Sequence, residues 1–413
     1  MRNIYSSIDI GSDSIKIVTG EYVNGNFNVL ASTSVPSNGV RRGLITDSAL
    51  ATESLKNGVL EHEKVLGMMI KKAIVTVPSN DRRINVVESK IPILGEFVTG
   101  FDVSKVLEEA VTGKVKEDEE VVSVVPIIFA IDDVQHMVNP NGVKADNLSV
   151  KAVLVAAPKK QIMDVINVVS AAGVEVIEIT FGCIGDYYEL RDNQTDGQVG
   201  AIINIGRDKT EVSVFNKGIL IKSSIINLGS KNVDKDISYV YDTDINTSRD
   251  LKENFAFASR KDSDTSESVD VQISDGNLST INQTDVSGVV EARLEELLNL
   301  AKKETNNLTK RKISYIIVTG GITELPGVNT VVENALGIEG RVHKATTPGI
   351  RDNKYTSATG IIRYFHDKMV LREREVSFVD DDDVELMMKN KKSMIELTDN
   401  TIISKIYGYL SNN

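Results

Sequence analysis

Two segments that lie far apart in the chain share one pattern of apolar, polar and glycine residues. SIDIGSDSIKIV at 7–18 and INIGRDKTEVSV at 203–214 both follow I-D/N-I-G-x-D, and each ends one predicted strand and opens another. A glycine lets the backbone approach a ligand closely, and the successive N–H groups of a tight turn bind anions. Ser12 and Ser14 add hydroxyl donors to the first turn, and Lys16 adds a positive charge. One such turn alone is usually only a turn, but the repeat predicts a duplicated pair of phosphate-binding hairpins.

A third glycine-containing segment, IVTGGITELPG at 317–327, follows a predicted buried strand. Gly320 and Gly321 leave bare backbone at the end of that strand, on which a flat base can lie. Alone, the segment is equally compatible with a plain turn between a strand and a helix. Together with the two hairpins it predicts a nucleotide-binding cleft.

Composition limits the kinds of protein that carry these motifs. The chain has 413 residues, enough for two to four domains, with 47 Lys and Arg against 59 Asp and Glu and a net charge of −12. This charge, without a basic stripe, excludes nucleic acid as a partner. Cys183 is the only cysteine, which excludes an intramolecular disulfide and fits a reducing cytoplasm. No apolar run is long enough for a signal peptide or a spanning helix, so we expect any membrane contact to be peripheral.

The remaining pattern predicts the elements that position the hairpins. Residues 4–35 are expected to form three strands in succession, followed by a helix that Asp47 caps and that ends near Gly67. Residues 84–160 are rich in strands around one amphipathic helix at 102–111, which is typical of a small inserted subdomain. Further helices are expected after 161 and at 286–304. The alternation of strands and helices indicates an α/β protein made of two similar halves.

The C-terminal part of the sequence differs from the rest. After YFHDKM at 364–369 the periodicity is lost, an acidic run spans 380–383, and a basic run spans 389–392. The final segment has an apolar helical stripe with one lysine beside it, formed by Ile402, Ile403, Ile406, Tyr409 and Leu410 with Lys405. Such a stripe predicts an amphipathic helix that lies on a membrane surface, and docking on the protein's own body is the alternative.

The order of these motifs resembles that of the actin, Hsp70 and sugar-kinase superfamily, and more narrowly that of the FtsA family of bacterial cell-division proteins. The resemblance covers residues 5–365, and its most specific phrase is NPNG at 139–142 within the inserted region. It implies an actin-like α/β fold, with two duplicated halves around a nucleotide cleft and an FtsA-type inserted α+β subdomain. The implied domains are 1–83 and 161–198 (first half), 84–160 (insert), 199–365 (second half, with a subdomain at 230–310), 366–395 (charged linker) and 396–413 (tail).

The resemblance also assigns roles around the nucleotide. It implies that Asp9 lies near Mg²⁺ and that Gly11, Ser12, Ser14 and Lys16 surround the β- and γ-phosphates of ATP. The other implied nucleotide-binding residues are Asn204, Gly206, Lys209, Thr210, Gly229, Lys252, Gly320 and Gly321.

The second hairpin and the ribose helix depart from the superfamily pattern. Asn204 stands where a second Asp is expected, and Arg249 stands where a Glu would accept a hydrogen bond from ribose. An amide carries no charge for Mg²⁺, so we expect ATP binding with weak or absent hydrolysis, and no catalytic residue is assigned. Arg207 and Lys209 either contact phosphate directly or face solvent, and the sequence leaves both possibilities open.

The same resemblance implies a function and its partners. The chain would be an ATP-binding scaffold that polymerises and tethers FtsZ filaments to the inner face of the plasma membrane at the division site. Arg293 would contact the C-terminal peptide of FtsZ, unless it only pairs locally with Glu291 or Glu296. The tail stripe with Lys405 would be the membrane anchor. A small-molecule kinase of the same superfamily and an actin-like adaptor of a pilus or secretion system are the alternatives.

Overall fold

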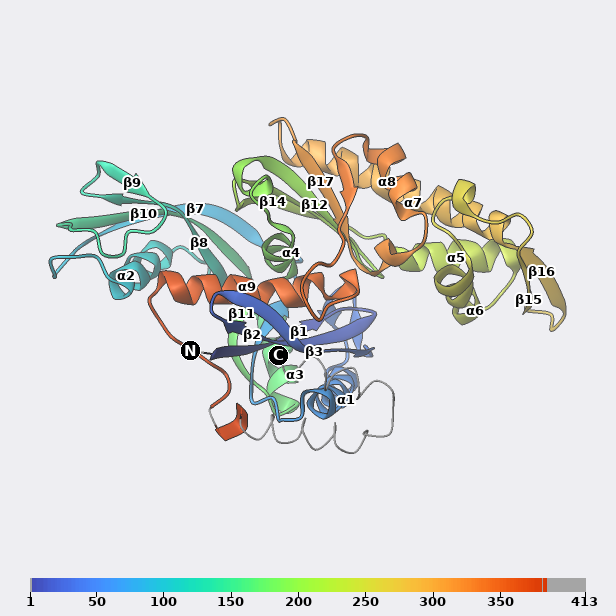
Figure 1. Cartoon of the computed structure of the whole chain (residues 1–413), viewed down its shortest axis with the longest axis horizontal. Helices are drawn as coiled ribbons and strands as arrows, with labels where there is room; N and C mark the ends of the chain where they lie inside the picture. Colours follow the sequence, from blue (N-terminus) through green and yellow to red (C-terminus); the bar gives the residue numbers. More distant parts are fainter. Residues whose placement is uncertain (1, 381, 385–413) are drawn as a thin grey trace, which may run out of the picture.

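The protein is built from two α/β halves, each organised around a five-stranded sheet (Figure 1). The structure is a computed structural model and describes residues 2–380 and 382–384. In both sheets three antiparallel strands are followed by two parallel ones, so β3–β2–β1–β6–β11 has the same arrangement as β14–β13–β12–β17–β18. The duplication predicted from the two hairpins is therefore present in the fold.

The strands of the first half are β1 (Arg2–Ile10), β2 (Ser14–Val23), β3 (Asn26–Pro36), β6 (Lys72–Val77) and β11 (Glu175–Phe181), with a short ladder of β4 (Val40–Arg41) and β5 (Leu44–Ile45). Its helices are α1 (Ser48–Leu66), α3 (Lys159–Ala171), α4 (Gly182–Leu190) and α9 (Thr356–Leu371). Asp47 caps α1 through its side chain and Gly67 ends it with a φ of 83°, which confirms both predicted ends.

The second half has β12 (Val199–Ile205), β13 (Thr210–Asn216), β14 (Ile219–Ile226), β17 (Tyr315–Thr319) and β18 (Gly340–Val342), with α8 (Val328–Leu336) beside them. A mainly helical subdomain extends from it, with α5 (Ser230–Tyr241), α6 (Ile245–Asp250), a π-helical turn η2 (Leu251–Phe255), the hairpin β15 (Ser268–Gln272) and β16 (Leu278–Asn282), and α7 (Gln283–Leu308). The described residues also contain four 3₁₀ turns: η1 (Thr195–Gly197), η3 (Arg260–Asp262), η4 (Gly321–Glu324) and η5 (Asn353–Tyr355).

The insert forms a separate sheet with its own hydrophobic core at one end of the molecule, opposite the helical subdomain (Figure 1). Its elements are β7 (Arg83–Pro92), α2 (Gly100–Val111), β8 (Glu119–Ile131), β9 (Gln135–Met137) and β10 (Asn147–Pro158). Asn141, in the NPNG phrase, donates from its side chain to the carbonyl of Leu371 at 2.9 Å. This bond satisfies a free carbonyl at the end of α9 and attaches the insert to the body.

Helix α9 returns the end of the chain to the first half. Tyr5, Val18 and Ile74 of the first sheet form one apolar cluster with Ala358, Ile361 and Phe365 of α9. The predicted domain boundary at residue 365 therefore falls inside α9. This helix belongs to the first half, because its apolar face packs against the apolar side chains of the first sheet.

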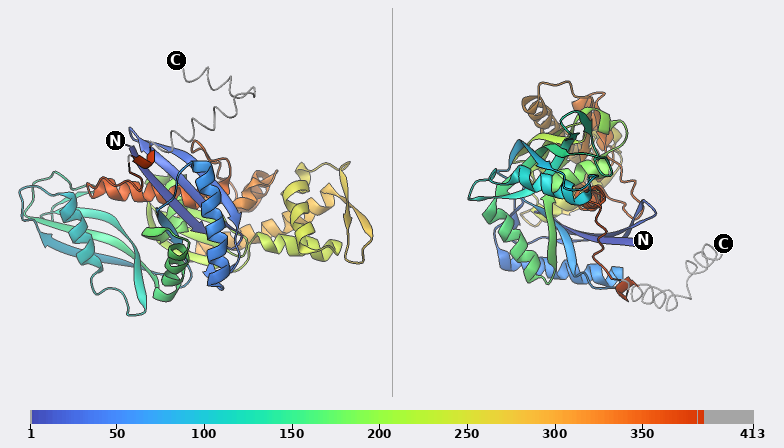
Figure 2. Two further views of the ribbon diagram at one scale, coloured as in Figure 1. Left: turned by 90° about the horizontal axis from the view of Figure 1, so that it is seen from below. Right: turned by 90° about the vertical axis from the view of Figure 1, so that its left-hand side faces the viewer.

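Part of the predicted charged linker also packs on the body. Phe378 is 6% exposed, lies against Tyr5 and Phe365, and its N–H donates to the carbonyl of Ile4 at 2.9 Å. Lys71 pairs with Asp383 at 2.7 Å. The rest of the linker and the whole predicted tail, including Ile402, Ile403, Lys405, Ile406, Tyr409 and Leu410, lie outside the described residues. Figure 2 shows the two halves, the insert and the helical subdomain from two further directions.

No helix in residues 2–380 and 382–384 has both the length and the apolar composition needed to cross a bilayer.

The backbones of α4 and α9 touch where they cross between the two sheets. A Cβ on Gly360 would lie 1.8 Å from the carbonyl oxygen of Gly185, and a Cβ on Gly185 would lie 2.4 Å from that of Ser357. No real side chain fits at these distances, so glycine is required at both positions.

We predict that Gly360→Ala lowers the free energy of unfolding by about 3 kcal/mol, because the added methyl group forces the helices apart. Gly288→Ala in helix α7 is the control, because a Cβ at Gly288 would meet only the Arg260 side chain, at 3.5 Å. The control is expected to be neutral or to stabilise by up to about 1 kcal/mol. Urea unfolding followed by circular dichroism measures both, and an unchanged midpoint for Gly360→Ala would contradict the close crossing.

Candidate functional site

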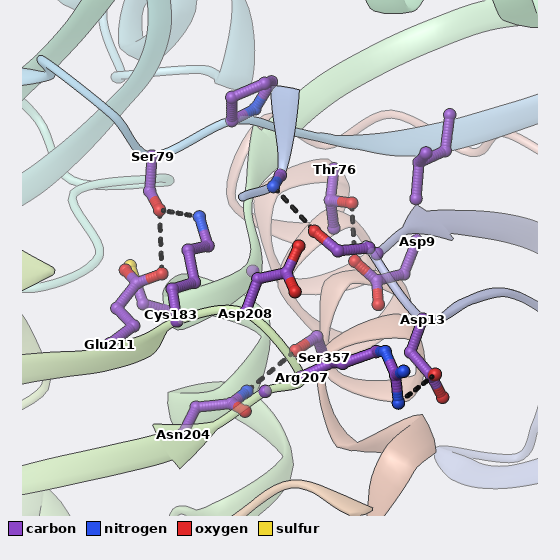
Figure 3. A pocket seen from close by; sticks show the side chains of 18 of the residues that line it. Asp9, Asp13, Thr76, Ser79, Cys183, Asn204, Arg207, Asp208, Glu211 and Ser357 are labelled. Carbon is purple, nitrogen blue, oxygen red and sulfur yellow. Dashed lines mark hydrogen bonds and ion pairs between the residues drawn. The ribbon is translucent and has the colours of Figure 1, made fainter. Parts of the chain in front are cut away.

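Two adjoining cavities lie between the halves, with volumes of about 150 and 530 Å³. Both are lined by residues of the two hairpins, and they share Asp13, Lys16, Gly206 and Arg207. We call the smaller one the inner cavity and the larger one the outer cavity. Figure 3 shows the inner cavity, where side chains from both halves point toward one another.

The first hairpin places all of its predicted residues on these cavities. Asp9, Gly11, Ser12 and Lys16 line the inner cavity, and Ser14 lines the outer one. Asp9 accepts a hydrogen bond from Thr76 at 2.7 Å and lies 3.5 Å from the Lys16 ammonium. A Cβ on Gly11 would lie 2.8 Å from the Lys16 ammonium, so glycine keeps the lysine at the turn.

The second hairpin places Asn204, Gly206 and Lys209 on the inner cavity but not Thr210. The Thr210 hydroxyl is fully buried and donates to the carbonyl of Leu228 at 2.9 Å. Thr210 therefore holds the hairpin together, because strand alternation turns its side chain away from the cavity.

Arg207 and Lys209 both face the cleft rather than solvent. Lys209 crosses to the first half, where its ammonium donates to the Ser79 hydroxyl at 3.2 Å. Burial lowers the pKa of Lys209, although Glu211 acts against this effect. Arg207 lies between two carboxylates, Asp13 at 3.5 Å and Asp234 at 3.3 Å.

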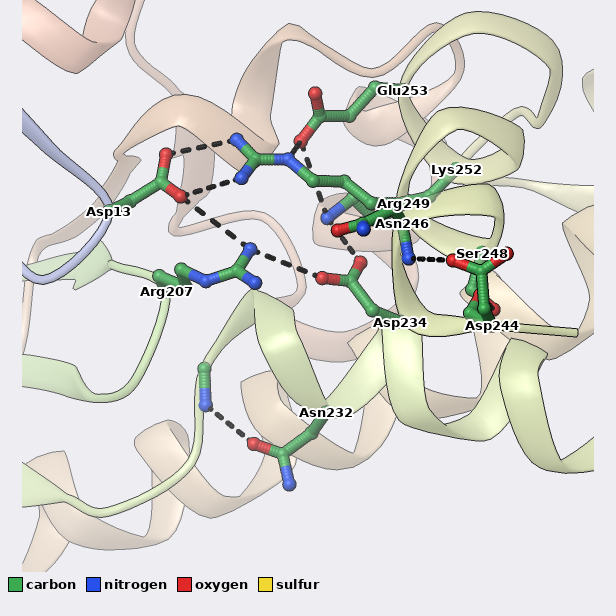
Figure 4. A network of polar contacts seen from close by, with 11 residues as sticks. Asp13, Arg207, Asn232, Asp234, Asp244, Asn246, Ser248, Arg249, Lys252 and Glu253 are labelled. Atoms are coloured by element: carbon green, nitrogen blue, oxygen red, sulfur yellow. Dashed lines mark hydrogen bonds and ion pairs between the residues drawn. The ribbon is translucent and has the colours of Figure 1, made fainter. Parts of the chain in front are cut away.

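A network of ion pairs lines the outer cavity between the first hairpin and the helical subdomain (Figure 4). Arg249 binds both oxygens of Asp13, at 2.9 and 3.1 Å. Lys252 is 3% exposed and pairs with Asp234 at 2.6 Å. Arg249, which stands where the resemblance predicts a Glu, thus places its guanidinium group against the first hairpin.

The remaining predicted glycines have different surroundings. Gly321 lines the outer cavity, whereas Gly320, with a φ of 105°, packs against the end of β12. A Cβ on Gly320 would lie 2.4 Å from the carbonyl oxygen of Ile205, and a Cβ on Gly229 would lie 2.4 Å from that of Gly206. Gly320 and Gly229 are outside the lining of both cavities and allow close backbone packing behind the second hairpin.

Sequence reasoning missed a buried polar cluster in the wall of the inner cavity, to which Ser79, Cys183 and Glu211 belong. Glu211 pairs with Arg82 at 2.7 Å and accepts from the Ser79 hydroxyl at 2.8 Å. Burial alone would raise the pKa of Glu211, but Arg82 and Lys209 outweigh it and lower this pKa to about 2. Burial raises the pKa of the neighbouring Cys183 thiol to about 12, which keeps it protonated and unreactive.

Sequence reasoning also missed Asp186, which lies on α4 and lines the inner cavity while being only 2% exposed. Its carboxylate accepts from Asn204 Nδ2 at 2.8 Å and from the Ser357 hydroxyl at 2.6 Å. Burial raises the pKa of Asp186 to about 7, against the opposite effect of these two hydrogen bonds. The one available signal was a lone carboxylate within the apolar run around Cys183.

The residues that line the inner cavity could hold a metal ion only if a bound ligand supplied further oxygen atoms to it. Among the described residues no three His, Cys, Asp or Glu side chains are grouped so as to hold a metal ion. Asp9 and Asp186 nevertheless face one cavity. Mg²⁺ binds through one or two carboxylates plus phosphate oxygens and water, so this pair is compatible with a nucleotide-bound cation.

The predicted partner residue Arg293 lies on a groove between α5 and α7 with a volume of about 470 Å³. It pairs with Asp236, at 2.9 Å for one of the two bonds, and with Glu296. The local pairing left open by the sequence is thus present, with Asp236 as the additional partner. Arg260 also lines the groove, over a floor that includes Gly288, Val289 and Ala292.

Comparisons with known proteins agree with this architecture. Residues 201–360 match the family model of the cell division protein FtsA, and residues 80–156 match that of the SHS2 domain inserted in FtsA. The cell division protein FtsA of Bacillus subtilis (strain 168) is 26% identical over 91% of this chain and 87% of its own length.

Solved structures share the fold at lower identity. A PilM–PilN type IV pilus biogenesis complex superposes with a TM-score of 0.58 and 13% identity, over 86% of this chain and 96% of the other. MreB5 of Spiroplasma citri bound to AMPPNP gives 0.52 and 14%, over 89% and 98%. The duplicated sheets, the insert and the two family matches, which together span more than half of the sequence, show that this chain is a member of the FtsA family of actin-like cell-division proteins.

Proposed function

We propose that the chain binds ATP in the two cavities and, as a filament, links FtsZ to the inner face of the plasma membrane at the division site. The observation that carries the proposal is the pair of duplicated hairpins that face each other across the cavities. Membership of the FtsA family favours this role over a small-molecule kinase or a pilus adaptor. The MreB5 structure of the same fold contains AMPPNP, which supports a nucleotide here.

The two cavities divide the nucleotide between them in this proposal. The phosphates face the inner cavity, where Gly11 and Gly206 bring backbone N–H groups close and Lys16 adds charge. The base and ribose occupy the larger outer cavity beside Gly321 and Lys252. Arg207 and Arg249 already bind the Asp13 carboxylate, so they are placed to exchange it for phosphate oxygens.

Hydrolysis is expected to be weak. Asn204 cannot supply the charge expected at its position, and a chain that acts by assembly does not need fast turnover. Mg²⁺, when bound with the nucleotide, neutralises phosphate charge next to Asp9. The chain's own residues orient the phosphates and keep the inner cavity small.

We expect Lys16→Gln to weaken ATP binding by about tenfold or more, because a hydrogen bond to a charged group is worth about 1.5 to 3 kcal/mol. Titration calorimetry with Mg²⁺ and ATP measures the affinity, and thermal shift reports folding. Lys56→Gln, an exposed lysine on α1, is the control and is expected to behave like the wild-type protein. The absence of both heat and thermal stabilisation with wild-type protein at millimolar ATP would contradict the nucleotide site.

The groove between α5 and α7 is the proposed site for the C-terminal peptide of FtsZ. Its apolar floor suits the side chains of a bound peptide, and Arg260 and Arg293 provide charge for an acidic group. Arg293 is shared with Asp236, so the peptide has to compete for this guanidinium group.

This competition predicts opposite effects of two substitutions. Arg293→Gln is expected to weaken binding of a synthetic FtsZ C-terminal peptide by about tenfold. Asp236→Asn removes the charge that holds Arg293 Nε and Nη2, while the pair with Glu296 remains, and is expected to preserve or strengthen binding. Fluorescence anisotropy measures both, with exposed Arg311→Gln as the control. Equal affinities for Arg293→Gln and the wild-type protein would remove Arg293 from the interface.

The membrane attachment in this proposal comes from the sequence pattern and the family. One tail with five apolar side chains holds a monomer weakly, and a filament with many tails binds firmly through avidity. Among the described residues that precede the tail in the sequence, Asp383 pairs with Lys71 of the first half at 2.7 Å.

Replacing both Ile403 and Ile406 by Asp is expected to abolish sedimentation with anionic phospholipid vesicles. Each charge costs about 2.5 to 3.5 kcal/mol at a bilayer centre and less at its surface, which exceeds the weak attachment of one tail. The double substitution Ser411→Asp with Asn412→Asp, which adds the same charge outside the stripe, is the control. Unchanged sedimentation of the Ile403 and Ile406 variant would show that another surface carries the attachment.

A further inference from the structure

Asp186 is a buried carboxylate whose surroundings supply hydrogen bonds but no positive charge. Its two donors, the Asn204 amide and the Ser357 hydroxyl, are neutral and come from β12 and α9. Among the described residues no Lys, Arg or His lies within ion-pair distance of it. A fully buried, uncompensated carboxylate is costly, and Asn at this position would retain a hydrogen bond without that cost.

The charged groups that face Asp186 from the neighbouring elements do not remove this cost. Asp9 on β1 and Glu211 on β13 are both negative and act on it unfavourably. Glu211 is already paired with Arg82, and the Lys209 ammonium is bound to the Ser79 hydroxyl. The inner cavity therefore contains a carboxylate for which the protein itself offers no cation.

The duplicated hairpins show where the matching carboxylate would be expected. Asp9 stands two residues before Gly11 in the first hairpin, and Asn204 stands two residues before Gly206 in the second. Asn204 is bound directly to Asp186, through a hydrogen bond of 2.8 Å. The negative charge missing from β12 is thus present one hydrogen bond away, on α4.

We propose that the second carboxylate of the nucleotide site has moved from β12 to α4 in this chain, so that Asp186 and Asp9 together face a divalent cation bound with the phosphates. This inference rests on the proposed nucleotide function. Asn204 and Ser357 act as positioning residues, since their hydrogen bonds fix the direction of the Asp186 carboxylate. Two carboxylates with phosphate oxygens and water form the type of ligand set that Mg²⁺ adopts in nucleotide sites.

The test exchanges the two side chains. Titration calorimetry compares ATP affinity with Mg²⁺ and with EDTA for wild type, Asp186→Asn, and the double variant Asp186→Asn with Asn204→Asp. We expect Mg²⁺ to tighten ATP binding by about tenfold or more in the wild-type protein, the effect of one charged contact. In Asp186→Asn this factor is expected to fall to about twofold or less, and in the double variant, which returns the carboxylate to β12, it is expected to recover.

A second variant separates the charge of Asp186 from its orientation. Ser357→Ala removes one of the two hydrogen bonds that orient Asp186 but keeps its carboxylate, so the Mg²⁺ factor is expected to lie between that of the wild type and that of Asp186→Asn. An Asp186→Asn protein that is folded and retains the full Mg²⁺ factor would overturn the inference, as would a folded double variant that fails to recover it. Failure of wild-type protein to bind ATP under either condition would instead overturn the proposed nucleotide site.

Discussion

The crossing of α4 and α9 sets the geometry on which the cleft depends. The two helices lie between the sheets, and their backbones touch at Gly185 and Gly360 because neither position has a side chain. Asp186 and Ser357, which belong to the same crossing, are thereby brought to the end of β12. A larger residue at the crossing would separate the sheets and move the two hairpins apart, so packing between the helices and the chemistry of the cavity share one constraint.

Charge is distributed across the cleft in a way that ties the halves together. The Asp13 carboxylate of the first hairpin is bound by Arg207 of the second hairpin and Arg249 of the helical subdomain, and Lys209 reaches the first half. Such contacts cost little to rearrange where they are partly exposed. A polyphosphate ligand can therefore replace carboxylate as the partner of these cations without leaving a buried charge unpaired.

The two residues that depart from the superfamily pattern, Asn204 and Arg249, both contact carboxylates that line the cleft. Asn204 lacks a charge but binds a carboxylate, and Arg249 is not a ribose acceptor but an ion-pair partner of the first hairpin. Each of these two residues therefore forms a hydrogen bond or an ion pair within the same cleft.

The sequence by itself determined the local features: the strand and helix periods, the caps of α1, the duplicated hairpins and the insert with its NPNG phrase. These depend on residues close together in the chain, whose spacing reports which face is buried. Only the tertiary structure decided that Thr210, Gly229 and Gly320 serve packing, that α9 belongs to the first half, and that Arg293 is shared with Asp236. The tertiary structure also placed Asp186 in the inner cavity. Its contacts with Asn204 on β12 and Ser357 on α9 join residues far apart in the sequence, and a local sequence pattern does not report such contacts.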